Sequence, residues 1–177
     1  MKNNMIIKAI QFATEKHKGQ ERRESGLPYV THPIIVSELI RQYKSSKQLE
    51  SLIVAALLHD TLEDTDTNFI EIATEFSPMV AGLVLELTSD KKEIKRLKEI
   101  HGKDKGKNEY LKRKMLGMSS YGLVIKLVDR LSNISDNPSD KYKENTIELL
   151  EFLVLERKLS KTHQRIVSDI FKIIQGD

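Results

Sequence analysis

A histidine and an aspartate follow directly on the longest apolar run of the chain. Residues 52–58 contain no polar side chain, and His59 and Asp60 come next. A carboxylate buried beside such a run is costly unless it has a hydrogen-bond donor or a cation as partner. A metal ion would remove this cost, but a core histidine hydrogen-bonded to its neighbour would do so too. The pair alone leaves both interpretations open.

Two more carboxylates, Glu63 and Asp64, come one helical turn after this pair. On a helix predicted over residues 49–62 they would stand at the C-terminal end, where negative charge opposes the helix dipole by about 0.3–1 kcal/mol. Selection for stability alone would not place two carboxylates there. Either they belong to an exposed turn that continues through Asp66, or they lie beside a metal and handle water.

A later segment carries four polar residues on one helix face, at spacings of three and four. They are Lys126, Asp129, Arg130 and Asn133, and most of the positions between them are apolar. One carboxylate, one amide and two cations on a common face suit a metal beside a phosphorylated ligand. The alternative is a solvated face on which Asp129 relieves the repulsion between its two basic neighbours. Spacing alone does not separate the two.

A further histidine, His32, stands just before a predicted helix start at Pro33. We place it in the loop before this helix, and that loop is expected to cover residues 19–31 at least. Taken alone, it is an ordinary surface or capping histidine.

Helical periodicity dominates the remaining sequence, and no segment alternates convincingly with the two-residue period of a strand. We therefore predict an all-α protein, a helical bundle that forms one domain over residues 1–177. Helix starts are indicated at Asn68 with Glu71 and at Ser77 with Pro78. A polar loop is expected over 102–108 and a break at Asn137-Pro138. A first helix is expected to end near residue 17, and a second to begin near residue 33. Further helices are expected over 49–62, 91–100, 110–118, 121–136, 142–157 and 160–174.

Composition limits the function classes. The chain has no cysteine, which excludes disulfides and zinc–thiolate sites, so nitrogen and oxygen atoms must hold any metal. No apolar run is long enough to span a bilayer and the first residues do not form a signal peptide, so we expect a cytoplasmic protein without a membrane partner. The 29 Lys+Arg and 26 Asp+Glu nearly cancel, which argues against a nucleic-acid partner.

Positive charge is concentrated in one segment, between residues 91 and 114. It is either a solvated lysine-rich surface or a basic rim that attracts a polyanionic small molecule. Its members are Lys91, Lys92, Lys95, Arg96, Lys98, Lys103, Lys105, Lys107, Lys112, Arg113 and Lys114.

In their order and spacing these residues resemble the HD superfamily of metal-dependent phosphohydrolases, whose pattern is a histidine, a His-Asp pair and a later aspartate. Within it the chain resembles the hydrolase domain of the RelA/SpoT-like alarmone enzymes, particularly the stand-alone small alarmone hydrolases. The similarity covers about residues 5–137, and the helices expected over 142–175 lie beyond it. It is carried by residues 17–20, 22–23, 25–33, 55–65 and 125–133.

The resemblance implies a single HD-type helical bundle that removes pyrophosphate from the 3′ position of guanosine tetraphosphate or pentaphosphate. It also implies manganese, or another divalent metal, as cofactor. The ligands implied for this metal are His32, His59, Asp60 and Asp129. Glu63 and Asp64 are implied as the residues that orient and deprotonate the attacking water.

The resemblance also implies substrate contacts. Asn133 would hold the nucleotide near its ribose and 3′-phosphate, and the pair Arg22 and Arg23 would lie along it. Lys126 and Arg130 would face the phosphates.

Two positions depart from the family pattern and leave the base of the nucleotide unsettled. Leu27 replaces a frequent glutamate, and Leu150 stands where we expect a tyrosine near the base. Two other functions stay open. One is a different HD phosphatase, acting on a deoxynucleotide or on the 2′-phosphate of NADPH. The other is a non-catalytic nucleotide sensor or antitoxin module. Oligomeric state cannot be predicted from these residues.

Overall fold

The computed structural model describes residues 5–22 and 25–176, which form helices with one isolated antiparallel bridge between Glu21 and Pro28 and no strand. The all-α prediction is confirmed. None of the described helices is both long and apolar enough to cross a membrane. The helices are α1 (Met5–Lys16), α2 (Thr31–Tyr43), α3 (Leu49–Leu58), α4 (Thr61–Asp64), α5 (Phe69–Glu75), α6 (Pro78–Leu87), α7 (Lys91–His101), α8 (Lys103–Gly117), α9 (Ser120–Ile134), α10 (Asp140–Glu156) and α11 (Lys161–Gln175).

Polar side chains cap the helices where the sequence predicts starts. Asn68 accepts a hydrogen bond from the backbone N–H of Glu71 at the start of α5. Ser77 accepts from the N–H of Val80 at the start of α6, with Pro78 as the first helical residue. Both predictions are confirmed.

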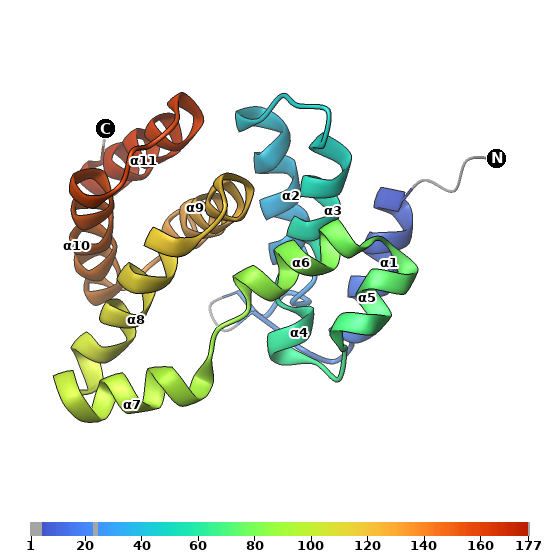
Figure 1. Cartoon of the computed structure of the whole chain (residues 1–177), viewed down its shortest axis with the longest axis horizontal. Coiled ribbons are helices and arrows are strands. Elements are labelled where there is room, and N and C mark those ends of the chain that lie inside the picture. The colour runs from blue at the N-terminus through green and yellow to red at the C-terminus, as the bar shows by residue number, and fades with distance from the viewer. Residues whose placement is uncertain (1–4, 23–24, 177) are drawn as a thin grey trace.

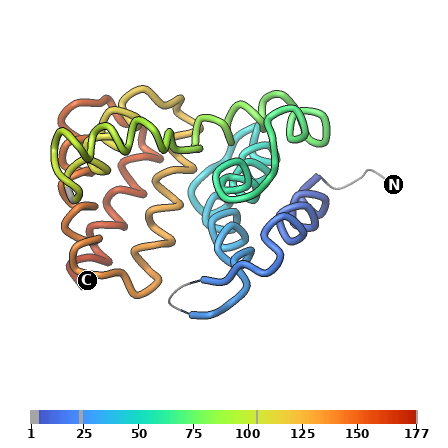
Figure 2. The backbone as a smooth tube through the Cα atoms, turned by 90° about the horizontal axis from the view of Figure 1, so that it is seen from below, coloured from blue at the N-terminus to red at the C-terminus, as the bar shows by residue number. Residues whose placement is uncertain are grey.

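The helices form two groups, α1 to α6 on one side and α8 to α11 on the other, with α7 running from the first group to the second (Figures 1 and 2). Helix α9 packs against α2, α3 and α6 of the first group and against α11 of the second. Helix α3 is the centre of the first group, and its residues 52–58 are almost completely buried. The polar face of α9 therefore lies where the two groups meet.

The central helix is shorter than the apolar pattern predicts. Helix α3 ends at Leu58, His59 and Asp60 form a turn, and α4 begins at Thr61, so the expected continuous helix over 49–62 is wrong. The buried Thr61 hydroxyl donates to the Leu58 carbonyl at 2.7 Å, and this local bond replaces a helical one. The two carboxylates that follow Leu62 thus lie in a separate short helix rather than at the end of a long one.

The loop predicted over 102–108 is also wrong, because only Gly102, with a φ of 87°, forms the turn between α7 and α8. From Lys103 onward the segment is helical and packs on α7. Packing overrides the weak helix propensity of this glycine-bearing segment. The predicted break at Asn137-Pro138 is confirmed, because it lies between α9 and α10. The assignment of residues 1–177 to one domain stays a prediction.

The contact between α7 and α8 depends on the absence of a side chain at Gly106. A methyl group at this position would overlap the backbone of Leu97 and Lys98. We predict that Gly106→Ala destabilises the protein by about 1–3 kcal/mol. Gly117→Ala, on the same helix with open space around it, should leave the melting temperature unchanged or raise it. Thermal unfolding of the three proteins tests this, and equal behaviour of the two variants would contradict it.

Candidate metal centre

Three side chains from different helices meet in the interior. They are His32 from α2, His59 from the turn after α3, and Asp129 from α9, and their ligand atoms all lie within 4.8 Å of one another. His32 and His59 are each 3% exposed and Asp129 is 8% exposed. Oδ1 of Asp129 lies 3.2 Å from Nε2 of His32 and 3.8 Å from Nε2 of His59. Residues 97 positions apart are thus combined in one buried cluster.

Local structure orients both imidazoles toward this cluster. Nδ1 of His59 donates to the carbonyl of Ala56 at 2.7 Å. Nδ1 of His32 lies 3.3 Å from the hydroxyl of Ser132 on α9. His32 lies in the first turn of α2, which begins at Thr31, rather than in the loop where the sequence placed it. The second nitrogen of each ring therefore faces Asp129.

The donor set fits a divalent cation. Because the Ala56 carbonyl can only accept a hydrogen bond, Nδ1 of His59 must carry a proton, which leaves Nε2 as the ligand atom. This Nε2 is buried and has no hydrogen-bond partner among the described residues, although Oδ2 of Asp60 lies only 2.9 Å away. A ring nitrogen so close to carboxylate oxygens requires positive charge between them, which either a proton on Nε2 or a bound metal ion supplies. Imidazole and carboxylate ligands suit borderline or hard divalent ions.

The electrostatics of the cluster point the same way. Burial lowers the pKa of His59, but Asp60 and Asp129 outweigh it and raise the pKa to about 9. Burial also opposes ionisation of the two carboxyl groups. The charge of His59 nevertheless lowers the pKa of Asp60, and Lys126 lowers that of Asp129. Both carboxylates are ionised, and a bound cation can replace the proton on His59.

Asp60, the fourth ligand implied by the sequence, lies beside the three-residue cluster and is not one of the three residues that converge. Its Oδ2 faces Nε2 of His59 and also accepts a 2.6 Å hydrogen bond from the hydroxyl of Tyr29. Its role as a ligand stays a prediction.

Asp129 is held by two neighbours on its own helix. Lys126 donates to Oδ2 at 2.9 Å, and the amide of Asn133 donates to Oδ1 at 2.8 Å. Arg130 turns away from Lys126 and donates to the hydroxyl of Thr146 at 2.7 Å. The repulsion expected between these two cations is therefore relieved. Spacing along one helix face predicted this grouping.

The cluster of His32, His59 and Asp129 opens into a cleft of about 730 Å³ between the two helix groups. Every predicted site residue that the structure describes lines this cleft, except His59, which lies behind it. Arg23 is outside the described residues. The predicted residues that line the cleft are Arg22, His32, Asp60, Glu63, Asp64, Lys126, Asp129, Arg130 and Asn133.

The two carboxylates of α4 have different surroundings. Oε2 of Glu63 accepts a 2.9 Å hydrogen bond from the backbone N–H of Ser89 and is partly committed to holding α4 against the end of α6. Asp64 is exposed to the cleft, and burial together with the charges of Asp60 and Glu63 raises its pKa. A carboxylate with a raised pKa is a better proton acceptor near neutral pH.

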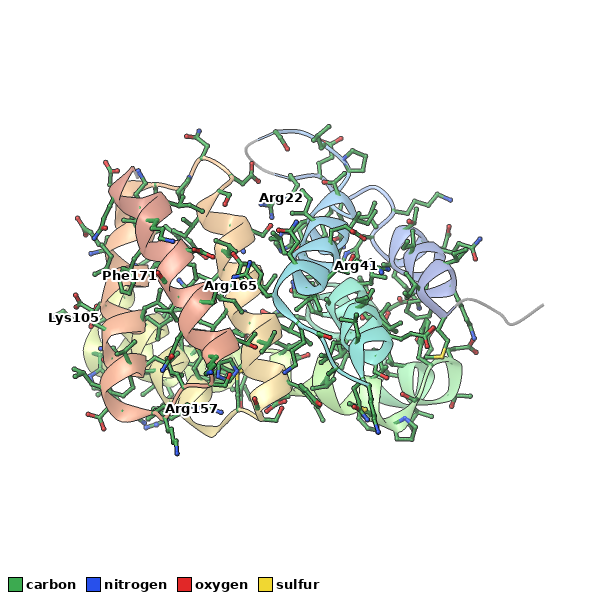
Figure 3. The ribbon with its side chains drawn as sticks, turned by 90° about the horizontal axis from the view of Figure 1, so that it is seen from above. Arg22, Arg41, Lys105, Arg157, Arg165 and Phe171 are labelled. Carbon is green, nitrogen blue, oxygen red and sulfur yellow. The ribbon has the colours of Figure 1, made fainter. Side chains whose placement is uncertain are left out.

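Arg22 bridges the two helix groups at the mouth of the cleft. It donates to Oδ2 of Asp136 at 2.6 Å and to Oδ1 of Asn133 at 3.3 Å. In Figure 3 it lies between the blue helices of the first group and the orange helices of the second. Two of the predicted substrate contacts, Arg22 and Asn133, therefore contact each other.

The region near the expected base differs from the sequence prediction. Leu150 is completely buried in the core and cannot contact a nucleotide in the cleft. Tyr142 lines the cleft instead, beneath the guanidinium of Arg130, whose carbon lies 5.2 Å from the ring centre. Tyr142 lies eight residues before Leu150, so the spacing of the family pattern did not indicate it.

The basic segment is part of the same cleft. Lys98, Lys103 and Lys107 line it, which favours the basic-rim interpretation over a surface facing only solvent. Burial, followed by the charge of Lys126, lowers the pKa of Lys107. The sequence did not predict where this segment lies, because residues 102–108, which include Lys103 and Lys107, were expected to form a loop.

Comparison with known proteins agrees with this geometry. The family profile described as HD domain matches residues 9–151.

This chain belongs to the HD domain family.

Relatives of this HD domain include a guanosine-3′,5′-bis(diphosphate) 3′-pyrophosphohydrolase MESH1 from Danio rerio, 34% identical over 75% of the chain and 68% of the relative. The Homo sapiens protein of the same name is 36% identical over 74% and 68%. A guanosine-3′,5′-bis(diphosphate) 3′-pyrophosphohydrolase from Aquifex aeolicus is 36% identical, but the match covers 73% of this chain and only 17% of that protein.

A solved structure described as "A metazoan ortholog of SpoT hydrolyzes ppGpp and plays a role in starvation responses" is similar over nearly its whole length. The TM-score is 0.76 at 26% identity, covering 97% of this HD domain chain and 96% of the other. The similarity extends beyond residue 137, where the sequence resemblance ended, and includes the C-terminal helices.

Metal binding is the first testable consequence of this centre. Treatment with a chelator should lower the melting temperature. A divalent cation at about 100 times its dissociation constant should then raise the free energy of unfolding by about 2.7 kcal/mol. Asp129→Asn should abolish most of this stabilisation, because a neutral amide replaces a charged ligand. Asp140→Asn, a change at an exposed carboxylate, should retain all of it. Identical metal-induced shifts in both variants would contradict the assignment.

Proposed function

We propose that this protein is a metal-dependent guanosine-3′,5′-bis(diphosphate) 3′-pyrophosphohydrolase. The observation that carries the proposal is a buried His-His-Asp cluster that opens into a cleft lined by cations. Both the family and the named activity of the relatives support it. The cations that line the cleft are Arg22, Lys98, Lys103, Lys107, Lys126, Arg130 and Lys141.

The charge distribution of the cleft suits a nucleotide that carries phosphate at both ends of its ribose. Acidic side chains gather around the His32–His59–Asp129 cluster, while cations come from α7, α8, α9, α10 and the loop after α1. Such an arrangement attracts a polyanion and places one phosphate group next to the metal ligands. A neutral or singly charged substrate would leave Lys98, Lys103 and Lys107, which have no ion-pair partner in the part of the chain that the structure describes, without an anion to bind.

We propose His32, His59, Asp60 and Asp129 as ligands of manganese or another divalent metal. Such an ion would acidify a water molecule and neutralise charge on the phosphoryl group. Water adds to the phosphorus attached to the 3′ oxygen, the bond between these two atoms breaks, and the 3′ oxygen takes up a proton. The products are GDP or GTP and pyrophosphate.

The remaining residues act by position and charge, since phosphoryl transfer needs little covalent chemistry from the protein. Glu63 and Asp64 hold the attacking water and accept its proton. Asn133 fixes the ribose and 3′-phosphate, and Lys126 and Arg130 face the phosphates. Arg22, together with Arg23, lies along the nucleotide once the substrate displaces Asp136 from it.

The proposal is tested by incubating pure protein with manganese and a panel of nucleotides, with the products separated by ion exchange. We expect pyrophosphate and GDP or GTP from the 3′-pyrophosphorylated guanosine nucleotides, and far slower reaction of simple nucleotides. Much faster hydrolysis of deoxynucleotides or of the 2′-phosphate of NADPH would contradict the substrate but not the family. Tight nucleotide binding without any hydrolysis would favour a sensor instead.

A second prediction separates chemistry from binding. Glu63→Gln and Asp64→Asn should each lower kcat by a factor of at least about 10², because a positioned general base contributes about 10² to 10⁴. Metal content, nucleotide affinity and melting temperature should stay close to wild type, since the amides preserve shape. The side-chain carbonyl that Glu63→Gln introduces can still accept a hydrogen bond from the N–H of Ser89.

Asp66→Asn is the matched control for this pair. Asp66 is two positions further along the chain, and its side chain is 87% exposed and paired with Lys16. The substitution removes the same charge without approaching the cleft, and kcat should not change. Wild-type turnover in both α4 variants would remove these carboxylates from the mechanism.

A further inference from the structure

The phenol of Tyr29 contacts Asp60, the proposed fourth ligand of the metal. Its hydroxyl donates a 2.6 Å hydrogen bond to Oδ2 of Asp60, the same oxygen that lies 2.9 Å from Nε2 of His59. An ordinary phenol is protonated at neutral pH, and the carboxylate can only accept, so the hydroxyl is the donor of this bond.

Tyr29 is held by contacts of its own, independently of Asp60. Its ring packs against that of His17, with 4.8 Å between centroids and 39° between planes, and is edge-on to His32 at 6.1 Å. Its backbone N–H donates to the carbonyl of Gln20 at 2.9 Å. Gln20 in turn accepts from Nδ1 of His17 at 2.8 Å. The phenol is thus a fixed donor aimed at a carboxylate.

A carboxylate oxygen has two lone pairs, so Oδ2 of Asp60 can accept from a phenol and still face a cation. Without this bond, Asp60 would be free to rotate about its side chain away from His59. We propose that Tyr29 is a positioning residue whose hydroxyl holds the Asp60 carboxylate in place as the fourth metal ligand. This inference rests on the metal-binding part of the proposed function but not on the identity of the nucleotide.

Manganese titration of chelator-treated protein by calorimetry, with no nucleotide present, measures this role. Hydrogen-bond partners behind a metal ligand typically contribute a factor of about 10 to 100 in affinity. Tyr29→Phe removes only the hydroxyl, and we expect it to raise the Kd for manganese by about that factor. Tyr43→Phe is the matched control, because its hydroxyl donates to Asp169 at 2.8 Å, far along the chain from the cluster. It should leave the Kd unchanged.

A double-mutant cycle shows whether Tyr29 acts through Asp60. In an Asp60→Asn background, Tyr29→Phe should cause no comparable further loss of affinity, since the two residues act as a unit. Melting temperatures of the metal-free proteins identify any variant that is unfolded at the temperature of the titration. If Tyr29→Phe is destabilised, all four proteins are titrated at a lower temperature at which each is folded, and the cycle still decides.

Two results would overturn the inference. They are a wild-type Kd in Tyr29→Phe, or an equal loss in the presence and absence of the Asp60 carboxylate. Failure of the wild-type protein to hydrolyse guanosine nucleotides would contradict the proposed function and leave these metal titrations as informative as before.

Discussion

The rest of this structure depends on the contacts that the buried carboxylate of Asp129 makes. One oxygen lies 3.2 Å from His32 and accepts from Asn133, while the other accepts from Lys126. His32 belongs to the first helix group and Asp129 to α9, so the contact joins the two halves of the molecule. An ionised carboxylate at this depth is stable only because cationic and hydrogen-bonding partners surround it. Burial, charge and the meeting of the two groups are therefore linked at one residue.

The cleft follows from this arrangement. Because the two groups meet at the polar face of α9, the space beside that face is lined by side chains from both, and α7 and α8 add lysines to its rim. Asp129 lies deep with Lys126 paired to it, and the lysines of α7 and α8 lie at the rim. A cation bound among the ligands completes the neutralisation of the buried carboxylates, and a polyanionic ligand completes that of the outer cations. Metal and substrate are thus complementary to different layers of the same site.

Much of this could be predicted from the sequence, because it depended on local patterns. The caps at Asn68 and Ser77 use side chains within three residues of the groups they satisfy, and the face of Lys126, Asp129 and Asn133 follows from helical spacing. The break after Leu58 was missed because Leu62 follows one helical turn later and continues the apolar periodicity.

What could not be predicted depends on contacts between distant segments. Residues 102–108 looked like a loop because nothing in their composition reveals that Gly106 packs on the backbone of α7. The bond between Arg22 and Asp136 joins residues 114 positions apart, and Tyr142 enters the cleft through the packing of α10. Anomalous diffraction from crystals grown with manganese tests the central claim most directly. One strong peak should lie within coordination distance of His32, His59 and Asp129. Peaks only at surface carboxylates would contradict the account.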